Sequence, residues 1–219
     1  MSSIRTGRRI EAASSSSAQE PGAGTTGKNE SDSNADTCCL GTNFIILQYT
    51  QRTVDVYPYD TSYKPMTNIP IVSGATAWTN PRDNTTYILI FHESLYYGTK
   101  LDHSLINPNQ VRSSGIDFWD NPFDPLHEIG IEIDQGPTIP LMFEGTKLSF
   151  TSRAPTDAEL SSCQHIEMTS VLRWDPTNVS LATVQGKSRE PPLPAVRKLH
   201  ELSSNNPFNF ESRTKSTYL

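Results

Sequence analysis

Apolar residues in this chain of 219 residues fall in short runs and alternating segments, and both patterns favour β-strands over helices. Residues 44–47 form an apolar run of strand length, and apolar and polar residues alternate over residues 53–57. Proline, glycine, asparagine and aspartate separate these segments, as they do at turns. The pattern therefore predicts an all-β chain that is rich in turns.

Further strands are expected along the middle of the chain. Residues 76–78 and 87–91 flank a turn sequence, Pro81-Arg82-Asp83-Asn84, and so predict a hairpin. An earlier strand over residues 69–72 is expected to end at Gly74. The remaining strand candidates are residues 129–133, 139–143, 148–150 and 166–172.

Helical signals are few. Thr156 and Glu159 have the spacing of a capping box, which predicts a short helix that ends near Cys163. One helical turn is also expected within residues 102–111, ahead of Gly115.

The distribution of large apolar residues along the chain separates a segment that is expected to be ordered from two that are not. Hydrophobic residues make up 35% of the chain, and no Val, Ile, Leu, Phe, Tyr or Trp occurs between Ile10 and Cys38. Such a segment buries too little apolar surface to offset the entropy of ordering. We therefore expect a disordered, low-complexity N-terminus at residues 1–31, a β domain at residues 32–182, and a disordered Pro/Ser-rich tail at residues 183–219.

The net charge of the chain and the lengths of its apolar runs argue against nucleic-acid and membrane partners. A net charge of −6 gives no general attraction to nucleic acid or to anionic lipid, so we expect no direct nucleic-acid binding. No apolar run approaches the roughly 20 residues that a membrane helix needs, so no membrane partner is expected either.

The three cysteines, Cys38, Cys39 and Cys163, lack the spacing of a zinc site. An odd number of cysteines without a secretory signal is typical of reduced thiols in the cytosol or nucleus. The adjacent Cys38 and Cys39 are expected to pack in the core.

The segment with the clearest chemistry is Asp32-Ser33-Asn34-Ala35-Asp36-Thr37. An aspartate followed by small and hydroxylated residues suits a tight loop in which N–H and O–H groups hold a carboxylate. Two such loops that meet across a two-fold axis would place two carboxylates side by side, where they share one proton and can act as a base and an acid. A solvated polar turn is the alternative interpretation of the same string.

The string from Asp32 to Gly41 resembles the catalytic loop of retropepsins in copia-type retrotransposon polyproteins. A second stretch, residues 94–98 followed by residues 101–115, is similar to a Leu-Tyr…Asn-Leu-Leu-Ser-Val…Gln-Leu sequence of the same elements. Shorter similarities extend the resemblance over residues 32–176, about two-thirds of the chain.

The resemblance implies a retropepsin-like small β barrel or sandwich that is active only as a homodimer, because each chain supplies one loop. Asp32 would be the catalytic carboxylate, Ser33 would support it, and Asn34 would stand where the loop has glycine, since Asn tolerates a left-handed conformation. The substrate would be a peptide or polyprotein, and the reaction would need no metal or cofactor. The resemblance also implies an apolar strand before Asp32, whereas residues 27–31 are polar.

Two other functions are compatible with the sequence. The chain could be a non-catalytic relic or a co-opted protein-binding β module that keeps the scaffold, or an unrelated all-β interaction domain. The position of Asp32 is informative, because the site requires this residue at the end of a strand in the sheet.

Overall fold

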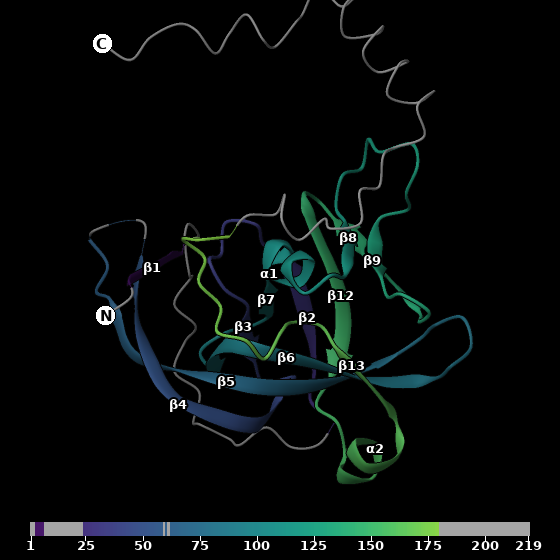
Figure 1. Ribbon diagram of the computed structural model, residues 1–219, viewed down its shortest axis with the longest axis horizontal. Helices are drawn as coiled ribbons and strands as arrows, with labels where there is room; N and C mark the ends of the chain where they lie inside the picture. The colour runs from purple at the N-terminus through teal and green to yellow at the C-terminus, as the bar shows by residue number, and fades with distance from the viewer. Residues whose placement is uncertain (1–2, 7–23, 59, 61, 180–219) are drawn as a thin grey trace, which may run out of the picture. The chain divides into compact units, whose positions relative to one another are not determined.

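The computed structural model describes residues 3–6, 24–58, 60 and 62–179, and in these residues the fold is all-β, as predicted (Figure 1). Thirteen strands are accompanied by two six-residue helices, α1 (Pro108–Ser113) and α2 (Asp157–Ser162). The strands are β1 (Ser3–Thr6), β2 (Thr26–Ser31), β3 (Cys39–Gly41), β4 (Ile45–Pro58), β5 (Met66–Thr79), β6 (Thr86–Gly98), β7 (Ser104–Ile106), β8 (Asp117–Trp119), β9 (Gly130–Glu132), β10 (Thr138–Pro140), β11 (Met142–Glu144), β12 (Lys147–Arg153) and β13 (Gln164–Glu167).

Ten of these strands form one sheet, whose central strand pairings close on themselves. The pairings run from β5 through β12, β2, β7 and β3 to β6, and β6 pairs with β5 again. β4 and β1 extend this arrangement from β5, β13 lies beside β6, and β11 lies beside β12. A separate three-stranded sheet has the order β10-β9-β8.

The three longest strands, β4, β5 and β6, lie side by side as two antiparallel pairs (Figure 1). The predicted hairpin is present between β5 and β6, where Trp78 pairs with Tyr87. The expectation that a strand ends at Gly74 is wrong, because β5 continues to Thr79. Gly74 is required by packing instead, since a Cβ at this position would lie 2.5 Å from Cδ1 of Leu40.

The largest hydrophobic core cluster lies around the pairing of β5 with β6 and around β3. Phe44 and Phe91 make an edge-to-face contact there, with ring centroids 5.5 Å apart. Leu40 and Leu89 are fully buried in the same cluster. Cys38 and Cys39 are buried too, as predicted.

The boundary of the ordered region differs from the expectation. Residues 1–31 were assigned to a disordered N-terminus, but residues 26–31 form β2, which pairs with β12 on one side and β7 on the other. Residues 3–6 form β1, whose backbone pairs with β4. The expected tail from residue 183 and residues 7–23 lie outside the described residues.

A buried cluster of polar side chains explains how the polar strand β2 is accommodated. Asn29 donates from Nδ2 to Oγ of Ser152 at 2.8 Å and accepts a hydrogen bond from Nδ2 of Asn43 at 2.9 Å. Asn43 in turn accepts from Oγ of Ser104 at 2.7 Å, and the hydroxyl groups of Thr76 and Ser152 are 2.6 Å apart. All five residues are buried. Because these side chains satisfy one another, the strand can enter the core without apolar residues.

The predicted capping box is present at the start of α2. Oγ1 of Thr156 accepts a hydrogen bond from the backbone N–H of Glu159 at 3.2 Å, and the Glu159 carboxylate accepts one from the backbone N–H of Thr156 at 2.9 Å. The guanidinium of Arg153 also donates to this carboxylate. The hydrogen bond from Arg153, with those from Thr156, lowers the pKa of Glu159 to about 2.

Glu159→Gln is therefore expected to destabilise the protein at neutral pH, and the difference should become smaller as the pH falls from 4.5 towards 2. A lowered folded-state pKa means that Glu159 contributes stability above its ordinary pKa of 4.5 and loses it as the pH falls towards 2. Urea unfolding at neutral pH and at about pH 3 measures this difference. Glu128→Gln is the control, because that side chain is 90% exposed and lies 3.8 Å from Arg82. An equal effect of both substitutions, or an effect that is independent of pH, would contradict the account.

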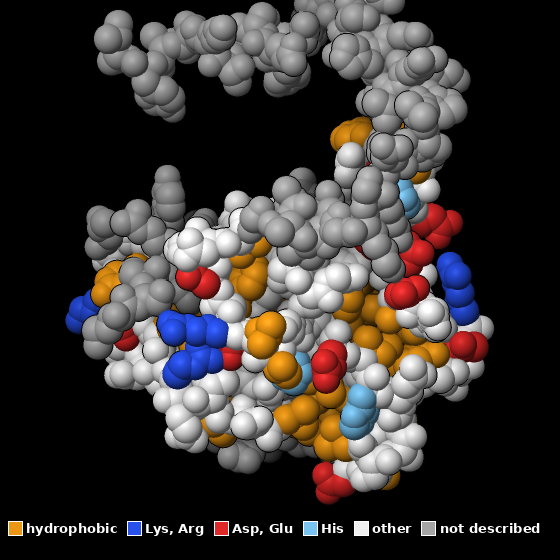
Figure 2. Space-filling view, in the orientation of Figure 1, with side chains coloured by type: hydrophobic (Ala, Val, Ile, Leu, Met, Phe, Trp, Pro, Cys, Tyr) orange, Lys and Arg blue, Asp and Glu red, His pale blue; other side chains and the backbone are white. Residues whose placement is uncertain are grey.

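The surface is dominated by uncharged groups. In the view of Figure 2, white backbone and polar side chains cover most of the described face, with small groups of hydrophobic, basic and acidic side chains between them. This matches a chain of which only 19% is charged. Neither helix of the described residues has the length and apolar character that crossing a membrane requires.

Candidate functional site

Asp32, the predicted catalytic residue, directly follows β2 in the sheet. Its backbone N–H donates to the carbonyl oxygen of Ile106, at the end of the parallel strand β7, with an N···O distance of 2.9 Å. Its Oδ1 accepts a hydrogen bond from the backbone N–H of Asn34 at 2.9 Å, which is an Asx turn. Asp32 is 5% exposed. The carboxylate is thus held at a strand end, within a tight loop.

Helix α1 anchors the rest of this loop. Nδ2 of Asn107 donates to the carbonyl oxygen of Ala35, and the backbone N–H of Cys38 donates to Oε1 of Gln110 at 2.8 Å. Asn107 is also the N-cap of α1, and Pro108 follows it at the first helical position. The helical turn expected within residues 102–111 is therefore present, and its first turn holds the loop from Asp32 to Cys38.

The other two predicted site residues, Ser33 and Asn34, are exposed at the tip of the loop. Asn34 is not among the described residues that have a positive φ, so the loop forms without the left-handed conformation expected for it. Among the hydrogen bonds of the described residues, Asp32 accepts from the backbone of Asn34 and not from the hydroxyl of Ser33. A supporting role of Ser33 stays a prediction.

The cysteines beside the loop are poorly suited to act as nucleophiles. Burial raises the pKa of the Cys38 thiol to about 12, although the backbone N–H of Asn107 donates to its sulfur at 3.3 Å. Burial also raises the pKa of Cys39, and the nearby Cys38 and Asp32 add to this effect. Both thiols are protonated at neutral pH, so a thiolate reaction is disfavoured here.

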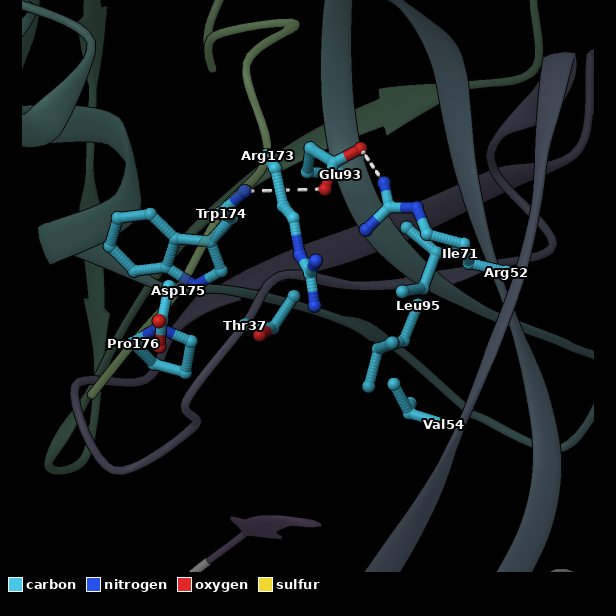
Figure 3. A pocket seen from close by; sticks show the side chains of 10 residues that line it. All are labelled: Thr37, Arg52, Val54, Ile71, Glu93, Leu95, Arg173, Trp174, Asp175 and Pro176. Atoms are coloured by element: carbon cyan, nitrogen blue, oxygen red, sulfur yellow. Dashed lines mark hydrogen bonds and ion pairs between the residues drawn. The ribbon is translucent and has the colours of Figure 1, made fainter. Parts of the chain in front are cut away.

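A pocket adjoins the loop, and sequence reasoning missed it. Thr37 of the loop forms one part of its wall, and strands β4, β5 and β6 and the segment 173–176 form the others (Figure 3). The lining residues are Thr37, Arg52, Val54, Ile71, Glu93, Leu95, Arg173, Trp174, Asp175 and Pro176. The one sequence signal that reaches this last segment is the resemblance over residues 32–176, which ends there.

Trp174 connects the pocket to the loop. Its indole Nε1–H donates to the carbonyl oxygen of Asp36 at 2.8 Å, and its backbone N–H donates to Oε2 of Glu93 at 3.2 Å. Glu93 also forms an ion pair with Arg52, and its side chain is only 6% exposed. The segment that contains Trp174 is therefore fixed both to the loop and to β6.

The loop supplies one carboxylate, Asp32, in a buried and hydrogen-bonded position. A single carboxylate can act as a base or as an acid, but hydrolysis of an amide needs both at once. A second copy of the loop would complete such a pair. Within the described part of the chain, no three His, Cys, Asp or Glu side chains gather in a way that could hold a metal ion.

The chain was compared with known families and proteins. No family model, no curated protein and no solved structure matches it.

Proposed function

We propose that this chain is an aspartic endopeptidase of the retropepsin type, which hydrolyses peptide bonds as a homodimer. The observation that carries the proposal is the position of Asp32: a buried carboxylate at the end of a sheet strand, held by the backbone of its own loop. An exposed Asp32 without hydrogen bonds from its own loop would instead have favoured the alternative interpretation, a solvated polar turn.

In the proposed dimer, the two Asp32 carboxylates lie side by side and share one proton, because like charges at about 3 Å cannot both ionise. The ionised carboxylate takes a proton from a water molecule, whose oxygen attacks the peptide carbonyl carbon. The protonated carboxylate gives its proton to the carbonyl oxygen. When the tetrahedral intermediate collapses, the carboxyl group that took the water proton gives it to the amide nitrogen and the C–N bond breaks. A hydroxyl group of the intermediate returns a proton to the other carboxylate, which yields a carboxylic acid, an amine and the shared-proton pair again.

The surface around Asp32 supports pairing with a second copy. Ser33 and Asn34 are exposed directly beside the buried Asp32. Asn107 donates a hydrogen bond to the loop and Gln110 accepts one from it, at Ala35 and Cys38, so neither contact involves Ser33 or Asn34. Two loops that meet at their tips around a two-fold axis would bring the two carboxylates together, and two-fold dimers are the commonest assemblies of identical chains. The cytosol or nucleus, where Cys38 and Cys39 stay reduced, is the proposed location.

Incubation with a peptide library at about pH 4–6 tests the proposal, since a shared proton requires acidic to near-neutral conditions. We expect cleavage whose rate rises more steeply than linearly with protein concentration, together with a dimer in sedimentation at micromolar concentration. A strictly monomeric chain that cleaves nothing would overturn the proposal and leave the protein-binding β module as the better interpretation.

A further inference from the structure

We propose that the pocket beside the loop binds the carboxylate of an acidic side chain, Glu or Asp, of a peptide substrate. Arg173 and Thr37 would be its polar contacts. This inference rests on the proposed function for the identity of the ligand as a peptide, because the pocket and Asp32 share one loop.

The pocket wall contains a buried hydroxyl group, that of Thr37, without a hydrogen-bond partner in the described part of the chain. The residue is 3% exposed. Buried hydroxyl groups in proteins are nearly always paired, and leaving one unpaired is costly. Oγ1 itself has almost no accessible surface, so the Thr37 side chain, which lines the pocket, would rotate to donate a hydrogen bond to a ligand oxygen there.

Four charged residues line the pocket: Arg52, Glu93, Arg173 and Asp175. Glu93 already neutralises Arg52 in an ion pair. The carboxylate of Asp175 accepts hydrogen bonds from the backbone N–H of Thr177 at 3.0 Å and from Nδ2 of Asn178 at 2.8 Å, which hold it in its own turn.

Arg173 is the second cation of the pocket wall. The hydrogen bond from Thr177 lowers the pKa of Asp175, and the positive charge of Arg173 adds to this effect. Arg173 is exposed, makes none of the ion pairs found among the described residues, and extends toward Thr37 (Figure 3). The guanidinium of Arg173 and the hydroxyl of Thr37 are both hydrogen-bond donors in the wall of this pocket, and an anion can accept hydrogen bonds from both.

The size and the lining of the pocket suit a small polar group on a short apolar stem. The pocket holds about 50 Å³, which is more than the roughly 10–15 Å³ that one water needs and suits a group of a few atoms. Val54, Ile71 and Leu95 line its apolar part and can cover the methylene groups of an acidic side chain. The planar guanidinium of Arg173 matches a carboxylate in two parallel hydrogen bonds.

The position of the pocket connects it to the proposed reaction. Thr37 follows Asp32 by five residues in the same loop, and the opposite wall belongs to the β4–β5 hairpin. A side chain held between them would belong to a peptide whose backbone passes close to the loop. The pocket would therefore select where the peptide is cut.

A binding experiment tests the pocket independently of catalysis. The full chain is titrated with N-acetyl-glutamate methylamide and, separately, with its glutamine analogue, and the indole N–H signal of Trp174 is followed by NMR after assignment with Trp174→Phe. We expect the glutamate compound to shift this signal and the glutamine compound to bind at least about tenfold more weakly, as for loss of a charge-assisted hydrogen bond.

Two variants and one control sharpen this test. Arg173→Gln should weaken binding of the glutamate compound by about tenfold, and Thr37→Val by a smaller factor, because a neutral hydroxyl contributes less than a charged donor. Arg82→Gln, at an arginine that is 74% exposed on the turn between β5 and β6, should bind as the wild type does. Circular dichroism confirms that each variant folds. Equal binding of the two compounds, or unchanged binding in Arg173→Gln, would overturn the inference.

Cleavage provides the second readout. In a peptide library we expect acidic residues at one fixed position relative to the cut, and a ratio of kcat/KM for the Glu and Gln peptides that falls about tenfold in Arg173→Gln. Selective binding of the glutamate compound without any cleavage would uphold the carboxylate pocket and reject the peptidase. Cleavage without a preference for acidic residues would uphold the peptidase and reject the pocket as a subsite.

Discussion

Asp32→Asn is expected to abolish peptide cleavage, lowering kcat/KM by about 10²–10⁴-fold or more. The amide of asparagine cannot take a proton from water, so the dimer would lose both its base and its acid. The substitution is nearly isosteric, and Oδ1 of asparagine can still accept the hydrogen bond from the backbone N–H of Asn34. The loop should therefore keep its shape, and the loss should lie in kcat more than in KM.

Asp36→Asn is the matched control, because Asp36 belongs to the same loop. Its backbone carbonyl, which accepts the hydrogen bond from Trp174, is unchanged by the substitution. We expect cleavage to survive in Asp36→Asn. Cleavage that persists in Asp32→Asn and disappears in Asp36→Asn would reject Asp32 as the catalytic residue.

Asn43→Leu is expected to destabilise the fold by about 3–5 kcal/mol, the largest effect on stability that we predict. Asn43 is 1% exposed and donates from Nδ2 to Asn29 at 2.9 Å and to Ser152 at 3.0 Å. Its Oδ1 accepts from Ser104 at 2.7 Å. Leucine would leave Oδ1 of Asn29 without its donor and the hydroxyl of Ser104 without its acceptor. Ser152 would keep its hydrogen bonds with Asn29 and Thr76. Each buried group that is left unpaired costs about 1–3 kcal/mol.

Urea unfolding of Asn43→Leu and of the wild type measures this loss as a decrease in the midpoint at unchanged m-value. Gln48→Leu, at an exposed amide side chain of β4, is the control and should change stability by no more than about 0.5 kcal/mol. A loss below about 1 kcal/mol in Asn43→Leu would mean that the polar cluster does not hold β2 in the core.

The parts of the fold that were predicted correctly have local signals. The β5–β6 hairpin follows from alternating residues around a turn sequence, and the capping box of α2 lies within four consecutive residues. Strand β2 has no such signal. Asn29 and Glu30 are polar in sequence yet buried, and the partner of Asn29 in β12, Ser152, lies 123 residues further along the chain. A hydrophobic pattern cannot reveal a strand that is buried through distant polar contacts.

The candidate site also has a part with a local sequence signal, the loop, and a part without one, the pocket. The loop around Asp32 could be predicted because its residues are consecutive. The pocket could not, because Thr37, Glu93 and Arg173 come from segments that only the folded sheet brings together. The Asn-Pro pair at positions 107 and 108 marks the start of a helix. The hydrogen bond from Asn107 to the loop could not be predicted from the sequence, because the two segments are far apart in the chain.

The central claim is that two chains contribute one Asp32 each to a single site. Its most direct test mixes wild type and Asp32→Asn in equal amounts at constant total concentration, after sedimentation has verified that both dimerise equally. Random exchange leaves about one quarter of the dimers with two aspartates, so the account predicts about one quarter of the wild-type cleavage rate. A rate of one half, which is proportional to the wild-type chains present, would show that each chain acts alone and would contradict the account.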